Sequence, residues 1–450
     1  MKDLKDIKAV YFLGIGGIGM SALARYFNSN GIRVSGYDKT PTPLTDKLQQ
    51  EGISIHFEDN TELIDKEAEL VVYTPAVPKD HKEYNYLLSH HYTVLKRSDV
   101  LGMITKGTYS ICVAGTHGKT TTSSMVAHIL RDSGFGCNAF LGGIASNYAT
   151  NFWYSEKNVS VAEADEYDRS FLKLFPDVAV ITAMDPDHLD IYGTPEKLQD
   201  AFVEFANQVK PGGLLICKSG LKRSDEFKAA KISYSVSDSA ADAYPVNIKI
   251  SKGSYVFDLE IKGELIKNVE LNMGGMHNIE NAVAAIAVAK HVGIEDDKIR
   301  AAVASFRGVK RRFEYIIKND ERVMIDDYAH HPEELRVLIN GAKGLFPGQK
   351  CTVVFQPHLF SRTNDFANGF AEVLSMADEL ILLPIYPARE KPMEGVNSEI
   401  ILNRMKHSNA RVLSKEALLE EMKNTKPVFL ITAGAGDIDM LVEPIKKIIE

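Results

Sequence analysis

Short apolar runs that favour β-strands alternate with helical patterns along almost the whole of this 450-residue chain. Strands that alternate with helices are typical of parallel sheets built from strand–helix–strand units. The strand-like runs form three series, at residues 9–13, 33–38, 69–74 and 93–99, then 109–115, 159–165, 177–185 and 212–217, then 322–328, 351–357, 379–387 and 427–437. A β-hairpin is expected at 254–273 and a helix at 277–293. The sequence therefore predicts an α/β protein of three domains, at residues 1–108, 109–306 and 307–450.

The composition narrows the classes of function. Hydrophobic residues make up 45% and charged residues 25% of the chain, which is an ordinary balance for a globular protein. The formal charge of -8 argues against a nucleic-acid partner, because nucleic-acid-binding domains are usually basic. The N-terminus lacks the apolar stretch of a signal peptide, no apolar run approaches the roughly 18 residues of a membrane span, and the scattered cysteines form no C-x-x-C pair. We therefore expect a cytoplasmic protein with no membrane span, no zinc site and no disulfide framework.

A glycine-rich turn, GIGGIGMSALA, follows the first predicted strand and opens a helix. It contains G-x-G-x-x-G as Gly14, Gly16 and Gly19, a spacing that lets backbone amides approach a diphosphate at a helix N-terminus. Asp38 ends the second predicted strand, where an acid can bind a ribose hydroxyl group. The motif alone is compatible with a nicotinamide or flavin nucleotide, or with a tight turn that binds nothing. It indicates a diphosphate without saying which nucleotide carries it.

The stretch AGTHGKTTT (114–122) resembles a phosphate-binding loop whose first glycine is missing. The usual pattern is G-x-x-x-x-G-K-[ST], and Val113 stands where that glycine belongs. The stretch nevertheless lies between an apolar strand and a helical pattern, which is the context that a phosphate loop needs. Lys119 can then reach the β- and γ-phosphates of ATP, and the hydroxyl group of Thr120 can ligate Mg²⁺. The alternative is a surface loop with an incidental G-K-T, and an ATP site is the better interpretation.

Two acidic stretches, EADEYDRSF from residue 163 and DPDHLD from residue 185, each begin near the end of an apolar strand. Mg²⁺ prefers oxygen ligands and usually keeps several waters, so one carboxylate together with phosphates can hold it. Glu163 is a candidate ligand, and His188 is a candidate for ligating a second ion or orienting a phosphate oxygen. We expect most of the other acids to be solvated loop residues or helix caps, namely Asp165, Glu166, Asp168, Asp185, Asp187 and Asp190.

Eight motifs make the chain resemble the Mur ligases, in the order GIGGIGMSALA, GTHGKTTT, EADEYDRSFL, DPDHLD, HNIENA, RRFE, DDYAHHP and FQPHLFSRT. The shortened phosphate loop is the form that this family uses. The resemblance implies a Rossmann-like first domain that binds the UDP part of a sugar nucleotide, a central P-loop-type ATP-binding domain and a Rossmann-like C-terminal domain. It implies a ligase that uses ATP and two Mg²⁺ ions to activate the carboxylate of UDP-N-acetylmuramate as an acyl phosphate. The amino group of L-alanine would attack that acyl phosphate, with release of ADP and phosphate.

The resemblance also assigns roles to residues that match the family's motifs. It implies that Lys119 stabilises the γ-phosphate, that Thr120 and Glu163 hold the first Mg²⁺, and that His188 belongs to a second metal site. Further ATP contacts are expected from Gly115, Thr116, His117, Gly118, Thr121, Asn278, Asn281, Arg312 and Asp327, with Arg311 as a neighbour. The UDP-sugar site would consist of Gly14, Gly16, Gly17, Ile18, Gly19, Asp38, Thr74 and Ala76. Substrate contacts are expected among His330, His331, His358 and Arg362, which follow predicted strands.

Two of these assignments also have a physical reason. Asn278 and Asn281 lie one helical turn apart, so both amide groups can face one ligand. Arg312 is expected to act catalytically, because an arginine brought in by domain closure suits the charge that develops on a transferring phosphoryl group. One family feature is absent: several Mur ligases carry a carbamylated lysine shortly after the metal-site histidine, whereas QDAFVEF here has none. Lys197 is expected to point outward from a helix, and no carbamylated lysine is predicted.

Three other functions have different consequences. A nicotinamide-dependent oxidoreductase would leave Lys119, Thr120 and Glu163 without a purpose. A non-catalytic ATP-binding regulator would not release phosphate in response to a sugar nucleotide. A cell-wall recycling ligase that adds a preformed tripeptide to the same sugar nucleotide shares the architecture, but GIGGIGMSALA together with DPDHLD favours addition of alanine. We expect the enzyme to be a monomer or a weak homodimer.

Overall fold

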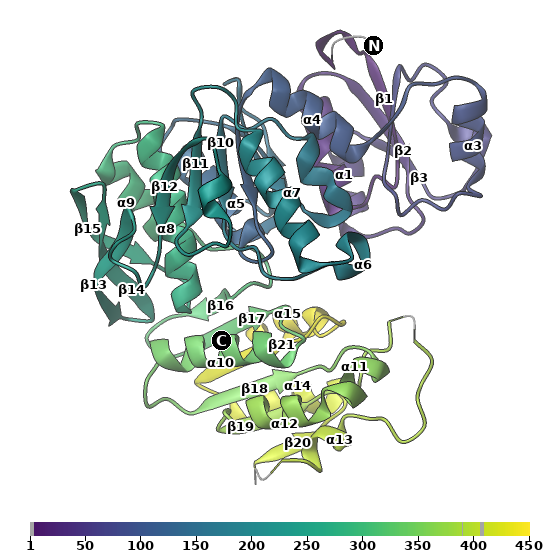
Figure 1. Cartoon of the computed structure of the whole chain (residues 1–450). Coiled ribbons are helices and arrows are strands. Elements are labelled where there is room, and N and C mark those ends of the chain that lie inside the picture. The colour runs from purple at the N-terminus through teal and green to yellow at the C-terminus, as the bar shows by residue number, and fades with distance from the viewer. Residues whose placement is uncertain (1–3, 389, 406–408) are drawn as a thin grey trace. The chain divides into compact units, whose positions relative to one another are not determined.

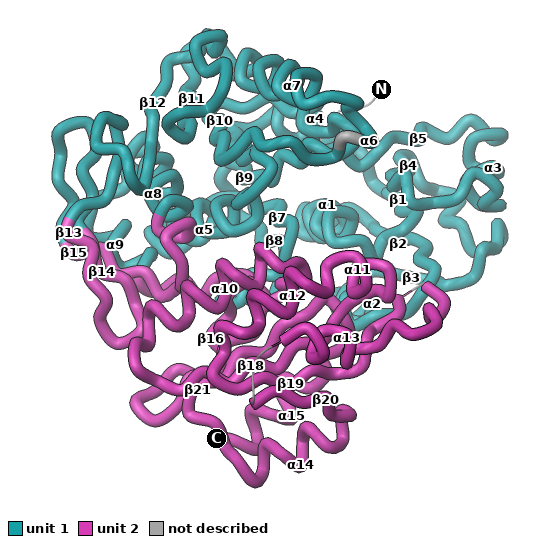
Figure 2. Tube along the Cα trace, turned by 60° about the horizontal axis from the view of Figure 1, so that its bottom comes forward, with its two compact units in different colours: residues 1–246, 258–267, 280–303 teal, residues 247–257, 268–279, 304–450 magenta. Residues whose placement is uncertain are grey.

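The computed structural model describes residues 4–388, 390–405 and 409–450 (Figure 1). The chain divides into two compact units, which Figure 2 shows in different colours. The first consists of residues 1–246, 258–267 and 280–303, and the second of residues 247–257, 268–279 and 304–450. Both N-terminal predicted domains therefore lie mostly within the first unit. The boundaries near residues 108 and 306 remain a prediction.

The N-terminal part of the first unit is a parallel sheet with the strand order β3-β2-β1-β4-β5. All five residues of β1 are buried, as expected for the middle strand of a covered sheet. Helix α2 begins at a capping box on Thr42, with Pro43 in its first turn. The elements are η1 (Leu4–Asp6), β1 (Ala9–Leu13), α1 (Ile18–Ser29), β2 (Arg33–Tyr37), α2 (Pro43–Gln50), β3 (Ser54–His56), η2 (Thr61–Leu63), β4 (Leu70–Tyr73), α3 (Lys82–Ser89), β5 (Val94–Lys96) and α4 (Arg97–Gly107).

The next part of the chain forms a sheet with the order β15-β14-β13-β12-β11-β10-β6-β9-β7-β8. Strand β6 lies between β9 and β10 and is parallel to both, so the loops after these three strands lie at one edge of the sheet. Residues of β13, β14, β15 and α8 are divided between the two units. The elements are β6 (Tyr109–Ala114), α5 (Lys119–Asp132), β7 (Asn138–Ala145), β8 (Thr150–Trp153), β9 (Val159–Ala164), η3 (Tyr167–Lys173), β10 (Val178–Ile181), α6 (Leu189–Tyr192), α7 (Pro195–Asn207), β11 (Leu214–Lys218), η4 (Ser224–Glu226), β12 (Ala230–Tyr234), β13 (Ala243–Ser251), β14 (Ser254–Ile261), β15 (Glu264–Leu271), α8 (Met276–His291) and α9 (Asp296–Ser305).

The second unit is built on a sheet with the order β16-β17-β21-β18-β19-β20, in which only the pair β16–β17 is antiparallel among the described strands. Neighbouring residues of β18 point to opposite faces: Val354 joins a core cluster with α14 and α15, whereas the Phe355 ring lies 5.4 Å from that of Phe370 on α12. The elements are β16 (Glu314–Lys318), β17 (Val323–Asp327), α10 (Pro332–Leu345), β18 (Cys351–Phe355), α11 (Phe360–Asp365), α12 (Ala367–Leu374), β19 (Glu379–Leu382), α13 (Glu399–Leu402), β20 (Ala410–Val412), α14 (Lys415–Thr425), β21 (Phe429–Ala433) and α15 (Asp439–Ile449).

One hydrophobic cluster joins the N-terminal sheet to the sheet that follows it. It contains Phe12 and Phe27 from the first sheet and Phe171, Phe202 and Phe205 from the segments around β9 and α7. Each buried aromatic side chain of this kind contributes about 1.5–3 kcal/mol to folding. This shared core holds the glycine-rich turn and the phosphate loop in one rigid unit.

Each predicted strand overlaps a strand of the structure, but several end earlier than predicted: β10 ends at Ile181, β19 at Leu382 and β21 at Ala433. Residues 93–99 were expected to form a strand, but β5 ends at Lys96 and Arg97 begins helix α4. Asp99 lies in the first turn of that helix, where an acid is favourable next to the helix dipole. The apolar pattern predicted the strand at 94–96, but it did not reveal that a helix begins at Arg97.

Candidate active site

The phosphate loop connects the end of β6 to the start of α5. Gly115 (φ +138°) and Gly118 (φ +80°) both have backbone conformations that favour glycine, and Gly118 caps the helix. A Cβ atom on Gly115 would lie 2.0 Å from Thr182 Oγ1, and one on Gly118 would lie 2.7 Å from Asn281 Oδ1. No side chain fits at either position. The loop is thus shaped to bring its amides and the N-terminus of α5 toward an anion.

Lys119, the first residue of α5, pairs with a buried acid. Its Nζ atom donates to the carbonyl oxygen of Gly115 at 2.8 Å and to Glu166 Oε1 at 2.8 Å, and lies 2.7 Å from Glu166 Oε2. The Glu166 side chain is completely buried. The expectation that Glu166 is a solvated loop acid is therefore wrong. Its position three residues after Glu163, in E-A-D-E at the end of a buried strand, was the signal available in the sequence.

Thr120 and Glu163 lie together, as the sequence predicted for the first metal ligands. Thr120 Oγ1 donates to Glu163 Oε1 at 3.1 Å, and the amide of Gly142 on β7 donates to Glu163 Oε2 at 3.1 Å. Glu163 on β9 pairs with Val113 on the neighbouring parallel strand β6, which leads into the phosphate loop. A hydroxyl group and a carboxylate are oxygen ligands, so this pair fits the preference of Mg²⁺.

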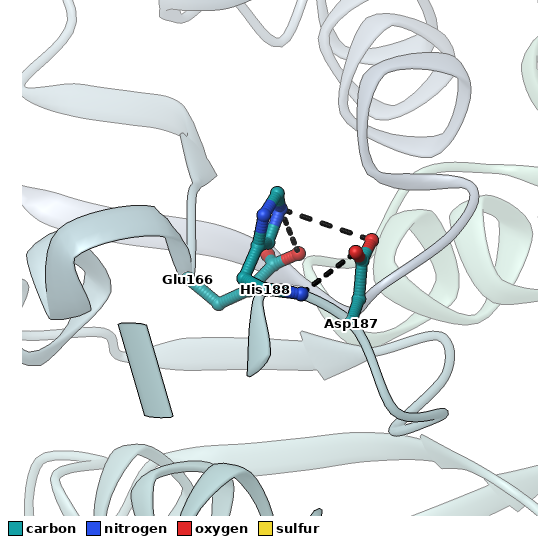
Figure 3. A group of neighbouring side chains, drawn as sticks. All are labelled: Glu166, Asp187 and His188. Carbon is teal, nitrogen blue, oxygen red and sulfur yellow. Dashed lines mark hydrogen bonds and ion pairs between the residues drawn. The ribbon is translucent and has the colours of Figure 1, made fainter. Parts of the chain in front are cut away.

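His188 forms a second cluster with two acids (Figure 3). Its Nε2 atom lies 3.9 Å from Glu166 Oε1 and 3.8 Å from Asp187 Oδ2, and its backbone amide donates to Asp187 Oδ1 at 2.7 Å. One donor atom from each of the three residues lies within 4.8 Å of the others. His188 has a φ of +50°, a strained backbone conformation of the kind that concentrates at functional sites. Asp187 is partly exposed, as expected for most of these acids, and it also belongs to a group that can hold a cation.

The segment QDAFVEF, which contains no lysine, forms part of helix α7 after His188. Residues 199–205 lie on α7, where Phe202 and Phe205 are fully buried in the core. Lys197 is exposed on the same helix. Glu166 and Asp187 therefore supply the acidic groups that lie next to His188.

The two asparagines of HNIEN have separate partners in the structure. Asn281 accepts a hydrogen bond from Thr122 Oγ1 at 3.2 Å and lies against Gly118, so it supports the phosphate loop from behind. Asn278 donates through Nδ2 to the carbonyl oxygen of Gly274 at 2.7 Å. Both side chains are buried.

The glycine-rich turn is held by the strand next to it. The amides of Gly14 and Ile15 donate to the carbonyl oxygen of Tyr37 at 2.8 and 3.0 Å. The amide of Gly16 donates to Asp38 Oδ2 at 2.7 Å, so Asp38, which was expected to bind a ribose, also shapes the loop itself. A Cβ atom on Gly14 would lie 2.6 Å from Thr74 Cγ2, which places the predicted Thr74 beside the turn.

A cavity of about 300 Å³ joins the predicted sugar-nucleotide turn to the predicted metal carboxylate. The N-terminal part of the chain lines it with Gly17, Ile18, Gly19, Thr74 and Arg97, and the part after β6 lines it with Leu141, Gly142, Glu163 and Asp165, among others. Ala76 is exposed in the turn after β4 and does not line this cavity. Two sites that lie far apart in the sequence therefore open into one space.

The RRFE motif lies in the second unit and has a strained backbone. Arg311 (φ +59°) and Phe313 (φ +48°) flank Arg312, whose side chain is exposed. Arg311 donates through Nε to Asp326 Oδ2 at 3.2 Å, which makes Arg311 a structural residue of this unit. Asp327 accepts from the amides of Phe313 and Ala329, both at 2.7 Å.

Burial raises the pKa of Asp327 to about 6, and the charge of Arg312 opposes that rise. Arg312 and Asp327, both predicted to contact ATP, are therefore neighbours that influence each other electrostatically. They are 15 positions apart in the sequence, and the β16–β17 hairpin brings them together.

The structure brings together three of the four weaker substrate candidates. The rings of His330 and His358 lie 6.1 Å apart, and the His358 ring stacks on Tyr386 at 5.8 Å. Burial lowers the pKa of His358, and the charges of Arg362 and His330 lower it further. His331 is different because it is the N-cap of α10, where its side chain accepts from the amide of Glu333. Tyr386 is an additional member of this group that the sequence did not indicate.

Models of known families match the chain in three consecutive segments. The model described as Mur ligase family, catalytic domain, matches residues 9–109, the Mur ligase middle domain matches residues 113–289, and the Mur ligase glutamate ligase domain matches residues 311–436. The chain belongs to the Mur ligase family. The shortened phosphate loop and the acids around it are thus those of a Mur ligase.

Several Mur ligases are similar to this chain over its full length. The UDP-N-acetylmuramate–L-alanine ligase of Flavobacterium johnsoniae is 50% identical and the alignment covers 99% of each chain. The protein of the same name from Cytophaga hutchinsonii is 48% identical, with 100% of this chain and 98% of the relative covered. The crystal structure of the UDP-N-acetylmuramate–alanine ligase of Thermotoga maritima is similar with a TM-score of 0.80 at 29% identity, and 98% of each chain is covered. A murein peptide ligase from Psychrobacter arcticus shares the fold, with a TM-score of 0.65 at 22% identity.

Among the described residues, no helix combines the length and the apolar character that crossing a membrane requires.

Proposed function

We propose that this Mur ligase uses ATP to join the carboxylate of UDP-N-acetylmuramate to the amino group of L-alanine, with ADP and phosphate as the other products. The observation that carries this proposal is the cavity that opens both to the glycine-rich turn and to Glu163. A ligase must bring the carboxylate of one substrate to the γ-phosphate of another, and this cavity provides that path. The full-length identity to alanine ligases supports the choice of L-alanine.

The chemistry explains why such a reaction needs ATP. A carboxylate is a poor electrophile because its oxygen is a poor leaving group. When a carboxylate oxygen attacks the γ-phosphorus, the bond to ADP breaks and an acyl phosphate forms. The amine then attacks the carbonyl carbon, and phosphate leaves with the former carboxylate oxygen. Positioning and charge neutralisation contribute most of the acceleration in phosphoryl transfer.

The residues of the phosphate loop fit ATP. Gly115 and Gly118 leave room for phosphate oxygens. When ATP binds, Lys119 would leave Glu166 and pair with the γ-phosphate instead. Thr120 and Glu163 would hold Mg²⁺, whose charge neutralises the phosphate oxygens when it is bound. Arg312, in the RRFE motif that matches the family, would add a further positive charge at the transferring phosphoryl group.

A second Mg²⁺ would be held at His188 with Glu166 and Asp187. These two acids take the place of the carbamylated lysine that several Mur ligases use. Release of Glu166 from Lys119 would make its carboxylate available for this ion. Lys119 would therefore leave the Glu166 carboxylate free for a cation when it pairs with ATP.

The remaining assignments follow from the same proposal. Three domains at residues 1–108, 109–306 and 307–450 bind the sugar nucleotide, bind ATP and close the site. His330, His358 and Arg362 form the group from which contacts to the amino acid come, because an arginine can bind its carboxylate. The enzyme acts as a monomer or a weak homodimer, in the cytoplasm, where its ATP is supplied.

Phosphate release tests the proposal. Mg-ATP and UDP-N-acetylmuramate are combined with L-alanine, L-glutamate, D-glutamate or the recycling tripeptide in turn, and phosphate and ligated product are measured. We expect release with L-alanine and a product of matching mass. Release with the tripeptide alone would identify a recycling ligase, and no release with any acceptor would remove the proposed function.

A further inference from the structure

Arg97 is a cationic residue of the shared cavity that none of the family motifs includes. It is the first residue of α4, and among the residues that line the cavity it alone carries a positive charge. Glu163 and Asp165 also line this cavity. Within the described part of the chain, Arg97 takes part in no hydrogen bond or ion pair. A guanidinium group in such a position is available to an anion.

Arg97 lies directly across the third glycine of the glycine-rich turn. A Cβ atom on Gly19 would lie 2.9 Å from Nη1, 3.0 Å from Cδ and 3.2 Å from Cζ of Arg97. In the general motif, the third glycine permits close packing of helix and strand. Here the space above Gly19 is occupied by the arginine. Gly19 and Arg97 therefore pack against each other, although they are far apart in the sequence.

The surroundings of Gly19 and Arg97 suit a doubly charged anion. Helix α1 begins at Ile18, no acidic residue lies in its first turn, and Gly17 caps it without a side chain. Ile18 and Gly19, at the start of this helix, line the same cavity as Arg97. Arginine binds phosphate through two parallel hydrogen bonds, which a lysine cannot reproduce.

We propose that Arg97 binds the diphosphate of the sugar nucleotide. The inference rests on the proposed function, which supplies the sugar nucleotide, and it adds a residue to that site. The diphosphate is favoured over the sugar carboxylate because Arg97 contacts the glycine-rich turn itself. The carboxylate must instead approach Glu163, which lines the cavity from β9, to meet the γ-phosphate.

Titration calorimetry with three ligands tests this assignment. UDP contains the diphosphate without the N-acetyl sugar. UDP-N-acetylglucosamine adds the sugar, and UDP-N-acetylmuramate adds the carboxylate as well. For Arg97→Ala we expect affinity for all three to fall by roughly 10- to 100-fold, because hydrogen bonds to charged groups are strong. Arg97→Lys should recover part of that loss. Gly19→Ala, which displaces the arginine, should weaken UDP binding in the same way.

Lys96→Ala is the matched control. Lys96 precedes Arg97, is exposed and pairs with Asp168 at 3.4 Å without lining the cavity, so its loss should leave UDP affinity unchanged. Unchanged ATP affinity in every variant shows that the fold is retained. If Arg97→Ala weakens only UDP-N-acetylmuramate, the residue binds the carboxylate and the proposal is wrong. Unchanged affinity for all three ligands also overturns it. A wild-type protein that binds neither UDP nor UDP-N-acetylmuramate would instead overturn the proposed function.

Discussion

Gly142→Ala would place a methyl group against the carboxylate that we assign to the first Mg²⁺. The added Cβ atom would lie 2.4 Å from Glu163 Oε2 and 2.6 Å from both Cδ and Oε1. Ordinary van der Waals contact begins near 3.4 Å, so the carboxylate must retreat by about 1 Å. Gly142 is exposed and lies outside the left-handed region, so alanine is otherwise compatible with its backbone.

The size of the effect follows from that displacement. A misplacement of about 1 Å in a positioned group costs roughly 100-fold in rate. Loss of support to a metal ligand costs about 10- to 100-fold in metal affinity or activity. We therefore expect turnover to fall by about 100-fold, equivalent to about 2.7 kcal/mol, with a higher Mg²⁺ requirement. The melting temperature should not fall, because the substitution buries no polar group and leaves no cavity.

The assay is steady-state phosphate release at a series of Mg²⁺ concentrations, together with thermal unfolding. Gly344→Ala is the control, since a Cβ atom there meets nothing within 4 Å and the residue lies on the exposed side of α10. Gly344→Ala should behave as the wild type. Wild-type turnover and Mg²⁺ dependence in Gly142→Ala would refute the assignment of Glu163 as the first metal ligand.

Three further substitutions test other parts of the site. Lys119→Ala should abolish ligation almost completely because the γ-phosphate loses its cation, and retained phosphate release would remove the phosphate-loop assignment. Arg312→Ala should lower kcat by roughly 100-fold or more while calorimetry shows unchanged binding of UDP-N-acetylmuramate, and lost sugar-nucleotide affinity would contradict its role. The pKa of His358 is lower in the folded protein than its ordinary 6.5, so the stability it contributes is complete above about pH 6.5 and is lost as pH falls through the folded pKa. Urea unfolding below pH 6.5 should therefore show a steeper loss of stability in the wild type than in His358→Gln, and parallel curves would exclude His358 as the cause.

Features that depend on neighbouring residues were predictable from the sequence. The phosphate loop follows a strand and precedes a helix, and its two glycines are required by their conformations. The resemblance to the Mur ligases paired Thr120 with Glu163, and the structure places Thr120 Oγ1 3.1 Å from Glu163 Oε1. The two residues can meet because loops after parallel strands lie at one edge of a sheet. These are local signals combined with one topological rule.

Features that depend on distant residues were not predictable. Glu166 is buried next to Lys119 of α5 and Tyr192 of α6, whereas its sequence surroundings are those of a polar loop. Arg97 contacts Gly19 only because β5 and α4 return to the glycine-rich turn. Asp38 likewise accepts a hydrogen bond from the amide of Gly16 only because the end of β2 lies beside the glycine-rich turn. A single sequence carries no record of such long-range contacts.

The central claim is that this enzyme activates a carboxylate as an acyl phosphate before alanine attacks. Transfer of an oxygen isotope tests it most directly. UDP-N-acetylmuramate labelled with ¹⁸O in its carboxylate is incubated with Mg-ATP and L-alanine, and the released phosphate is analysed by mass spectrometry. We expect one labelled oxygen in each phosphate formed with the ligated product. Unlabelled phosphate, or label recovered in AMP, would contradict it.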